Sequence, residues 1–326
     1  MVNSERVVMR VFTLALSIAL AIGAGEILLR VKNSSMRNYD MEMWKYSREL
    51  KQRLDNPDLP FTHVTSRTAQ LESVEIRLNE VGLRGAPLDP APQGGRRILF
   101  IGGSTTLGWG VAESDTVSAR VERMLTEAGE KAQVLNGGVA NYNAQRYVTR
   151  FFQELAPLKP TDIVVNFFHR DAEDLKVERA NPLLRHSQLA YTLWLASQRL
   201  FERPDEQGMA EHYRKVYDKN SHGFQVMRQK LRELSEYAKS NGIRIYLTAS
   251  PDVHNLVDYK YGFIHDIIHE IANEDGYTFI DLLPSMKGRS AESLFAMPGD
   301  PHPNALGHQL MAEAIFPVIH QPPANK

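Results

Sequence analysis

Five short apolar segments, alternating with helical patterns, constrain the fold of this 326-residue chain more than any other feature. The predicted strands lie at 97–102, 133–136, 162–168, 244–249 and 277–282. The predicted helices lie at 114–128, 144–155, 181–201, 221–241, 257–275 and 305–319. Strands that alternate with helices of this length form βαβ units, which build a parallel sheet covered on both faces. The sequence therefore predicts one α/β domain over residues 96–320.

The N-terminal segment predicts a membrane anchor. Arg6 and Arg10 precede an uninterrupted apolar stretch at 11–24, and apolar residues resume at 27–29. This length allows one spanning helix when the charged side chains near its ends reach the interfaces. An uncleaved signal anchor over residues 1–30 is favoured over a cleaved signal peptide. A buried or amphipathic helix is less consistent with a stretch that has almost no polar face. We expect the globular part to be periplasmic or extracellular.

Residues 31–95 predict a juxtamembrane arm, either a stalk or a cover, followed by a loop. Residues 31–75 are polar and irregular, with a helix-compatible stretch at 41–54, and 78–95 is rich in proline and glycine. Such composition is typical of a connection that leads into a domain.

Composition excludes several functions. The formal net charge of −1 gives no indication of nucleic-acid binding. The absence of cysteine excludes disulfides, thiolate metal sites and cysteine nucleophiles. His265 and His269 lie four residues apart on a predicted helix, which is half of a metal site, but two polar surface histidines are the favoured interpretation. No metal and no organic cofactor is expected.

Two separated segments carry the chemistry. Ser104 follows the first predicted strand after two glycines, at the sheet edge where ligand sites form. Asp300 and His302 stand 196 and 198 residues downstream, and the two prolines that flank His302 stiffen its loop. Serine, histidine and aspartate together can make an activated hydroxyl nucleophile, in which the acid orients the histidine. Alternatively, Ser104 caps the next helix. Asn304 is explained as the cap of the final helix, but capping does not account for Asp300 and His302.

These motifs resemble the SGNH/GDSL hydrolase superfamily, especially its bacterial membrane-anchored members. The likeness begins at Asn-Glu-Val-Gly-Leu-Arg-Gly (79–85) and continues with Gly-Gly-Ser at 102–104 and Val-Leu-Asn-Gly-Gly-Val at 134–139. The resemblance implies a three-layer α/β/α, flavodoxin-like fold with a central parallel sheet. It also implies that the Gly138 N–H contributes to the oxyanion hole.

The third and last blocks depart from the family pattern. Arg170 stands where the family has an asparagine that donates to the oxyanion, so Arg170 is the candidate substitute donor. The aspartate lies two residues before the histidine rather than three, a spacing that resembles the alginate O-acetyltransferase-like relatives. Asp281 is an alternative acid, although hydrogen bonding in a loop is its more usual role.

The resemblance implies a serine-dependent esterase that acts on an ester-bearing small molecule or glycan, such as O-acetyl groups of an envelope polysaccharide. The alternatives are a polysaccharide O-acyltransferase and a catalytically degenerate glycan-binding or assembly protein. Protein partners are left open. Trp194 and the leucines around it are expected to pack against the core, with an acyl or glycan pocket as the alternative.

Overall fold

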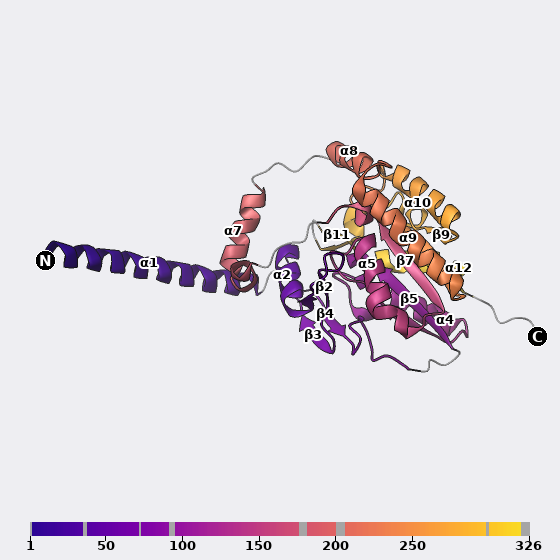
Figure 1. The fold of residues 1–326 in the computed structure, drawn as a ribbon, viewed down its shortest axis with the longest axis horizontal. Helices are drawn as coiled ribbons and strands as arrows, with labels where there is room; N and C mark the ends of the chain where they lie inside the picture. Colours follow the sequence, from indigo (N-terminus) through magenta and orange to yellow (C-terminus); the bar gives the residue numbers. More distant parts are fainter. Residues whose placement is uncertain are drawn as a thin grey trace, which may run out of the picture.

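A computed structural model describes residues 2–34, 38–71, 73–90, 95–175, 181–199, 206–297 and 300–320 (Figure 1). Its centre is a five-stranded sheet in the order β6-β5-β7-β8-β9, and all neighbouring strands in it are parallel. The strands are β5 (Arg96–Gly102), β6 (Ala132–Asn136), β7 (Asp162–Phe168), β8 (Arg244–Ser250) and β9 (Thr278–Asp281). The predicted parallel sheet is confirmed, with strand limits within one residue of those expected.

Helices cover both faces of the sheet. One face packs against α5 (Ala144–Arg150), α9 (His222–Ser240) and α10 (Gly262–Asp275), and the other against α4 (Val117–Glu127) and α12 (Ala305–Ile319). The side chains of β5 alternate between these two cores, because successive residues of a strand point to opposite faces. Leu99 and Ile101 belong to the first core, whereas Ile98 and Phe100 belong to the second. The predicted three-layer α/β/α architecture is therefore confirmed.

The segment before the sheet is ordered and folds onto the domain. It contains α2 (Tyr39–Glu49) and two antiparallel strand pairs, β1 (Lys51–Arg53) with β2 (Phe61–His63) and β3 (Arg67–Gln70) with β4 (Glu75–Leu78). Tyr46 and Ile76 from this segment share a third hydrophobic core with Leu107 and Trp109 of the α/β domain. The arm is therefore a packed cover rather than an irregular connection.

The helix α1 (Val2–Asn33) extends away from the domain (Figure 1). Residues 4–33 are long and apolar enough to cross a membrane, and none of their most apolar window is buried. Two shorter helices, α6 (Pro182–His186) and α7 (Gln188–Arg199), lie at the C-terminal end of α1. The predicted single buried helix over 181–201 is wrong, because it breaks at Ser187 and exposes Leu193 and Trp194. The last two residues of that range lie outside the described residues.

Shorter elements complete the described chain. They are α3 (Ser104–Leu107), α8 (Glu206–Val216), α11 (Leu283–Met286), and the antiparallel pair β10 (Phe295–Met297) and β11 (Asp300–Pro303). The helix α5 continues into a π-helical segment, η2 (Phe151–Leu155), and β7 is followed by a short helical turn, η4 (His169–Ala172).

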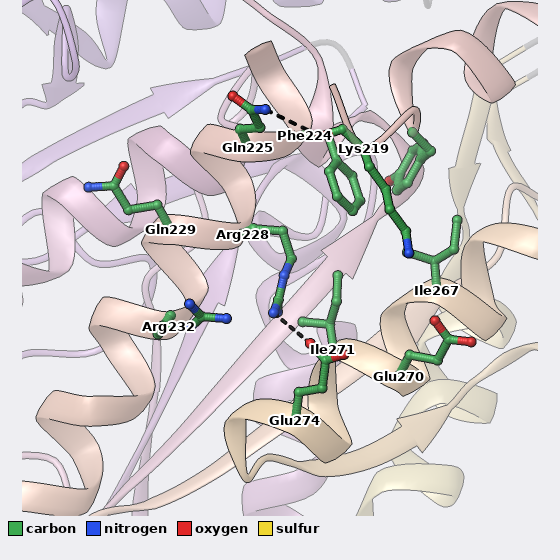
Figure 2. Close-up of a pocket in the computed structure, with 11 residues that line it drawn as sticks. Lys219, Phe224, Gln225, Arg228, Gln229, Arg232, Ile267, Glu270, Ile271 and Glu274 are labelled. Carbon is green, nitrogen blue, oxygen red and sulfur yellow. Dashed lines mark hydrogen bonds and ion pairs between the residues drawn. The ribbon is translucent and has the colours of Figure 1, made fainter. Parts of the chain in front are cut away.

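A surface groove of about 460 Å³ lies between α9 and α10 (Figure 2). Arg228 of α9 points to α10, where it forms ion pairs with Glu274 (2.7 Å) and Asp275 (2.6 Å). The lining of this groove includes none of the predicted catalytic residues. The groove is thus the seam between two ion-paired helices, and it is separate from the site described next.

Candidate active site

Ser104 stands at the point where the fully buried strand β5 turns into α3. The turn depends on Gly102, which has a φ of 156°. A Cβ atom at this position would lie 2.2 Å from Thr106 Oγ1 and 2.8 Å from the Asn166 carbonyl oxygen. Only glycine therefore lets α3 fold back so tightly on the end of the strand. The result places Ser104 at the carboxyl edge of the sheet.

His302 reaches Ser104 from the β10–β11 pair. Its Nε2 atom lies 2.7 Å from Ser104 Oγ. If the serine hydroxyl donates, Nε2 is the acceptor, and a neutral ring then carries its proton on Nδ1. The backbone of Asp300 pairs with Met297 across the hairpin. The Asp300 side chain lies outside the described residues, so its contact with His302 stays a prediction.

Gly138 lies directly against α3, the helix that begins at Ser104. A Cβ atom on Gly138 would stand 2.1 Å from the Leu107 nitrogen and 2.6 Å from the Thr106 carbonyl carbon. Its own N–H donates to Asn136 Oδ1 at 3.1 Å. The structure thus brings the predicted oxyanion glycine next to α3, with its N–H hydrogen-bonded to a side chain of the same loop.

Arg170 turns toward an acidic partner. Its guanidinium donates through Nε and Nη2 to Glu173 Oε2 at 3.2 and 3.1 Å, and about half of the side chain is exposed. Arg170 could donate a hydrogen bond to an oxyanion only if its ion pair with Glu173 opened. Beside it, Asp171 is buried and accepts from the Tyr147 hydroxyl and the Phe168 N–H. Burial raises the pKa of Asp171 to about 8.

Two aromatic rings pack beside His302. The Tyr39 ring from the start of α2 stacks on the imidazole at a centroid distance of 5.8 Å, and the buried Trp109 ring lies at 6.1 Å. Tyr39 also meets Trp109 edge to face at 5.9 Å. The sequence does not indicate Tyr39 as a site residue, because its segment reads as a polar connection. The available signal was the cluster of aromatic residues at 39–46.

Two buried arginines brace the loops of the site. Arg84 donates to the carbonyl oxygens of Leu107 (2.8 Å), Gly108 (2.6 Å) and Val111 (2.8 Å), which follow Ser104 in the chain. Burial lowers the pKa of Arg84 to about 10, although the group remains charged at neutral pH. Arg150 donates to Gly137 O at 3.0 Å, next to Gly138. The arginine of the 79–85 motif therefore positions the turn that carries Ser104.

A second polar cluster lies past the ends of β7 and β8. Asp252 Oδ1 lies 2.6 Å from His254 Nδ1, and Asp252 Oδ2 lies 3.8 Å from Nε2 of the buried His169. Burial lowers the pKa of His169 to about 4, so this ring is neutral at physiological pH. The carboxyl ends of parallel strands share one edge of a sheet, so this cluster flanks the Ser104 edge.

The remaining candidates serve structural contacts. The prediction of two surface histidines is wrong for His265, which is buried, with Nδ1 at 2.7 Å from Asp281 and Nε2 at 3.0 Å from the Tyr259 hydroxyl. His269 stacks on Phe279 at 4.8 Å. Asp281 is therefore engaged by His265. Within the described residues, no three histidine or acidic side chains gather as a metal site would require.

A parallel α/β/α sheet with a serine at its carboxyl edge and a histidine at hydrogen-bond distance is the arrangement of a serine hydrolase. The sequence matches the GDSL-like Lipase/Acylhydrolase family over residues 100–310, which is more than half of the chain. The chain belongs to this family, and it is an SGNH-type hydrolase that acts on ester bonds.

Solved structures with a similar chain path include TesA, at 14% identity and a TM-score of 0.43 over 69% of this chain and 98% of that one. The acetylxylan esterase Axe2 from Geobacillus stearothermophilus has 17% identity and a TM-score of 0.44 over 71% and 98%. A putative lipolytic protein of the G-D-S-L family from Desulfitobacterium hafniense has 18% identity and a TM-score of 0.44 over 68% and 99%. A search of curated proteins finds no match.

Proposed function

We propose that Ser104 is the nucleophile of this esterase and that His302 is its general base. The observation that supports this proposal is the 2.7 Å distance between Ser104 Oγ and His302 Nε2. The Ser104 oxygen forms a bond to the ester carbonyl carbon while His302 takes the hydroxyl proton. His302 then returns that proton to the leaving alcohol as the C–O ester bond breaks. Water attacks the acyl-enzyme in a second, equivalent step, and Asp300 orients the imidazole.

The oxyanion of the tetrahedral intermediate needs donors that are already in place. We propose the backbone N–H groups of Ser104 and Gly138 for this role. Gly138 would then share its N–H with, or release it from, Asn136 Oδ1. Arg170 is the proposed third donor, and it would have to leave Glu173 to act. Because one missing donor costs about 10²–10³-fold in turnover, this part of the site controls the rate.

We further propose that α1 anchors the enzyme in a membrane and that the domain lies on the periplasmic or extracellular side. The substrate class that we propose is a short acyl ester, such as an acetyl group on a glycan. Tyr39 and Trp109 support a short acyl group, because their rings occupy the space beside the imidazole. A sugar hydroxyl in place of water as acceptor would make the same site an acyltransferase.

The test is covalent labelling of the full chain in detergent with a fluorophosphonate, with the modified residue mapped by peptide mass spectrometry. We expect labelling at Ser104 that is lost in Ser104→Ala and in His302→Gln. His222→Gln is the matched control, because His222 is exposed and paired with Asp174 on the surface. Labelling elsewhere, or unchanged labelling in His302→Gln, would contradict the proposed roles.

A further inference from the structure

The helix α7 has a composition that does not suit a helix surrounded by water. Residues 188–198 carry no charged side chain and include three leucines, a tyrosine and a tryptophan. None of these residues is fully buried, and Leu193 is 62% and Trp194 37% exposed. Leu183 in the neighbouring α6 is 65% exposed. Soluble domains rarely leave such apolar surface uncovered, so α6–α7 needs an apolar environment.

The last turns of α1 hold α6–α7 in place. The Glu26 carboxylate accepts hydrogen bonds from the N–H groups of Gln188 (3.0 Å) and Leu189 (2.9 Å), the first residues of α7. Arg30 donates to the His186 carbonyl at the end of α6 (3.0 Å). A carboxylate at a helix N-terminus and a cation at a helix C-terminus are both favourable placements. The α6–α7 corner is therefore fixed to the end of α1.

The same corner is also fixed to the arm. Trp44 of α2 donates from Nε1 to the Leu184 carbonyl at 2.8 Å, and its ring lies 6.4 Å from that of Tyr191. Because both sides of the corner are held, α7 keeps a set direction. Figure 1 shows α7 running across the end of α1 rather than alongside it.

We propose that α6–α7 lies in the headgroup–acyl boundary of the bilayer that α1 crosses, with Leu183, Leu193 and Trp194 as the groups that contact lipid. This inference rests on the proposed anchoring of α1. A helix that crosses the end of a spanning helix lies along the membrane surface, where tryptophan and tyrosine are enriched. The helix α7 also packs directly on α1, where Leu189 lies against Gly25, and none of the apolar window of α1 is buried. The α6–α7 corner would seat the catalytic domain on the membrane at a fixed height.

The three tryptophans of the chain allow a direct test, since Trp44 and Trp109 are buried and Trp194 is exposed. The full chain is reconstituted into phosphatidylcholine vesicles with or without bromine on the upper acyl carbons, and tryptophan emission is compared with that of Trp194→Phe. We expect brominated lipid to remove most of the emission that Trp194 contributes, while aqueous acrylamide removes little of it. The control is Trp194→Phe/Val257→Trp, which moves the reporter to a site of 76% exposure on the domain. We expect acrylamide to quench the emission of this reporter and brominated lipid to leave it unchanged.

Co-sedimentation with the vesicles after an alkaline carbonate wash tests the anchoring separately. Loss of the protein from the vesicles overturns both the anchoring and the α6–α7 proposal. Retention with a Trp194 signal that acrylamide quenches and brominated lipid does not quench overturns the α6–α7 proposal alone. Retention with lipid quenching confirms both.

Discussion

Replacing Gly138 by alanine tests whether the loop after β6 sets the position of the nucleophile. The added Cβ would lie 2.1 Å from the Leu107 nitrogen, whereas ordinary contact begins at 3.4 Å. The loop and α3 must therefore separate by 1.3 Å. Because Ser104 is the first residue of α3, this separation disturbs its 2.7 Å contact with His302. A misplacement of about 1 Å in a catalytic group can cost about 10²-fold in rate.

We therefore expect Gly138→Ala to lower the second-order rate constant for fluorophosphonate labelling of Ser104 by about 10²-fold. Overpacking of this kind also costs about 1–3 kcal/mol of stability, visible as a lower thermal midpoint. Alanine keeps the backbone N–H, so the loss would report the displacement and not a deleted donor. The matched control is Gly262→Ala at the start of α10, where an added Cβ meets nothing within 4 Å.

The result that would refute this reasoning is a folded Gly138→Ala enzyme that labels at the wild-type rate. It would mean that the nucleophile helix does not depend on the close packing of the two backbones. If the variant labels slowly but has the thermal midpoint of the wild type, the displacement of Ser104 is supported and the expected loss of stability is refuted.

Three further predictions concern residues around Ser104. Arg84→Lys should lower stability by about 2–5 kcal/mol, because one ammonium cannot satisfy the three buried carbonyls that Arg84 reaches, and urea unfolding measures this. The raised pKa of Asp171, about 8 against 3.8 unfolded, means that the folded protein keeps a proton that the unfolded chain releases. Stability should therefore fall as pH rises from about 4 to 8, and Asp171→Asn should flatten that slope in unfolding measured across the range. Tyr39→Leu should lower kcat/KM for a p-nitrophenyl acetate probe about two- to tenfold, because it removes the ring that stacks on His302 and meets Trp109 edge to face. Unchanged values in any of these three experiments would contradict the corresponding contact.

The central sheet could be predicted from the sequence because its strands are buried on both faces. A strand such as β7 must then be apolar along its length, and this pattern is visible without any knowledge of its neighbours. The four strands of the arm are only three or four residues long, which is too short for a clear periodicity. Packing of α2 onto the nucleophile helix is a tertiary contact that local pattern does not contain.

The leucine spacing at 181–201 shows why an apolar pattern alone can mislead. Such spacing predicts that a helix is covered, but it does not say by what. The sheet already has both faces covered, so α7 lies outside the core, against the end of α1. His265 shows the opposite error, because its polar side chain predicted a surface position. It is buried instead, where Asp281 and Tyr259 satisfy its two ring nitrogens.

The site could be predicted to the level of residue types but not of geometry. Ser104 and His302 stand in short motifs that mark the ends of structural elements, so both could be selected as candidate site residues. Their separation depends on 198 residues of intervening fold, and no local pattern contains that distance. The hydrogen bond from Gly138 to Asn136 and the turn of Arg170 toward Glu173 likewise depend on side-chain directions. These side-chain directions bear on the proposed oxyanion donors, Gly138 and Arg170.

A chain of hydrogen bonds connects the arm to the loop that contains Gly138. The Ala140 N–H donates to the Tyr46 oxygen at 3.1 Å, and the Tyr46 oxygen lies 2.6 Å from His63 Nε2. His63 Nδ1 in turn lies 2.9 Å from the Gly82 carbonyl, which can only accept, so Nδ1 carries the proton and Nε2 accepts from the tyrosine. Burial lowers the pKa of His63 well below its usual value, which agrees with a neutral ring.

The arm contacts both the Gly138 loop and His302. The Lys51 ammonium of the arm adds a hydrogen bond to the Ala140 carbonyl at 2.8 Å, so both backbone polar groups of Ala140 are bound by the arm. The same α2 that supplies Tyr46 also supplies Tyr39 beside His302, and Met41 of α2 contacts Asn33 in the last turn of α1. The arm thus joins the end of the apolar helix to both sides of the catalytic pair. The end of α1 is therefore linked to His302 through direct contacts of α2.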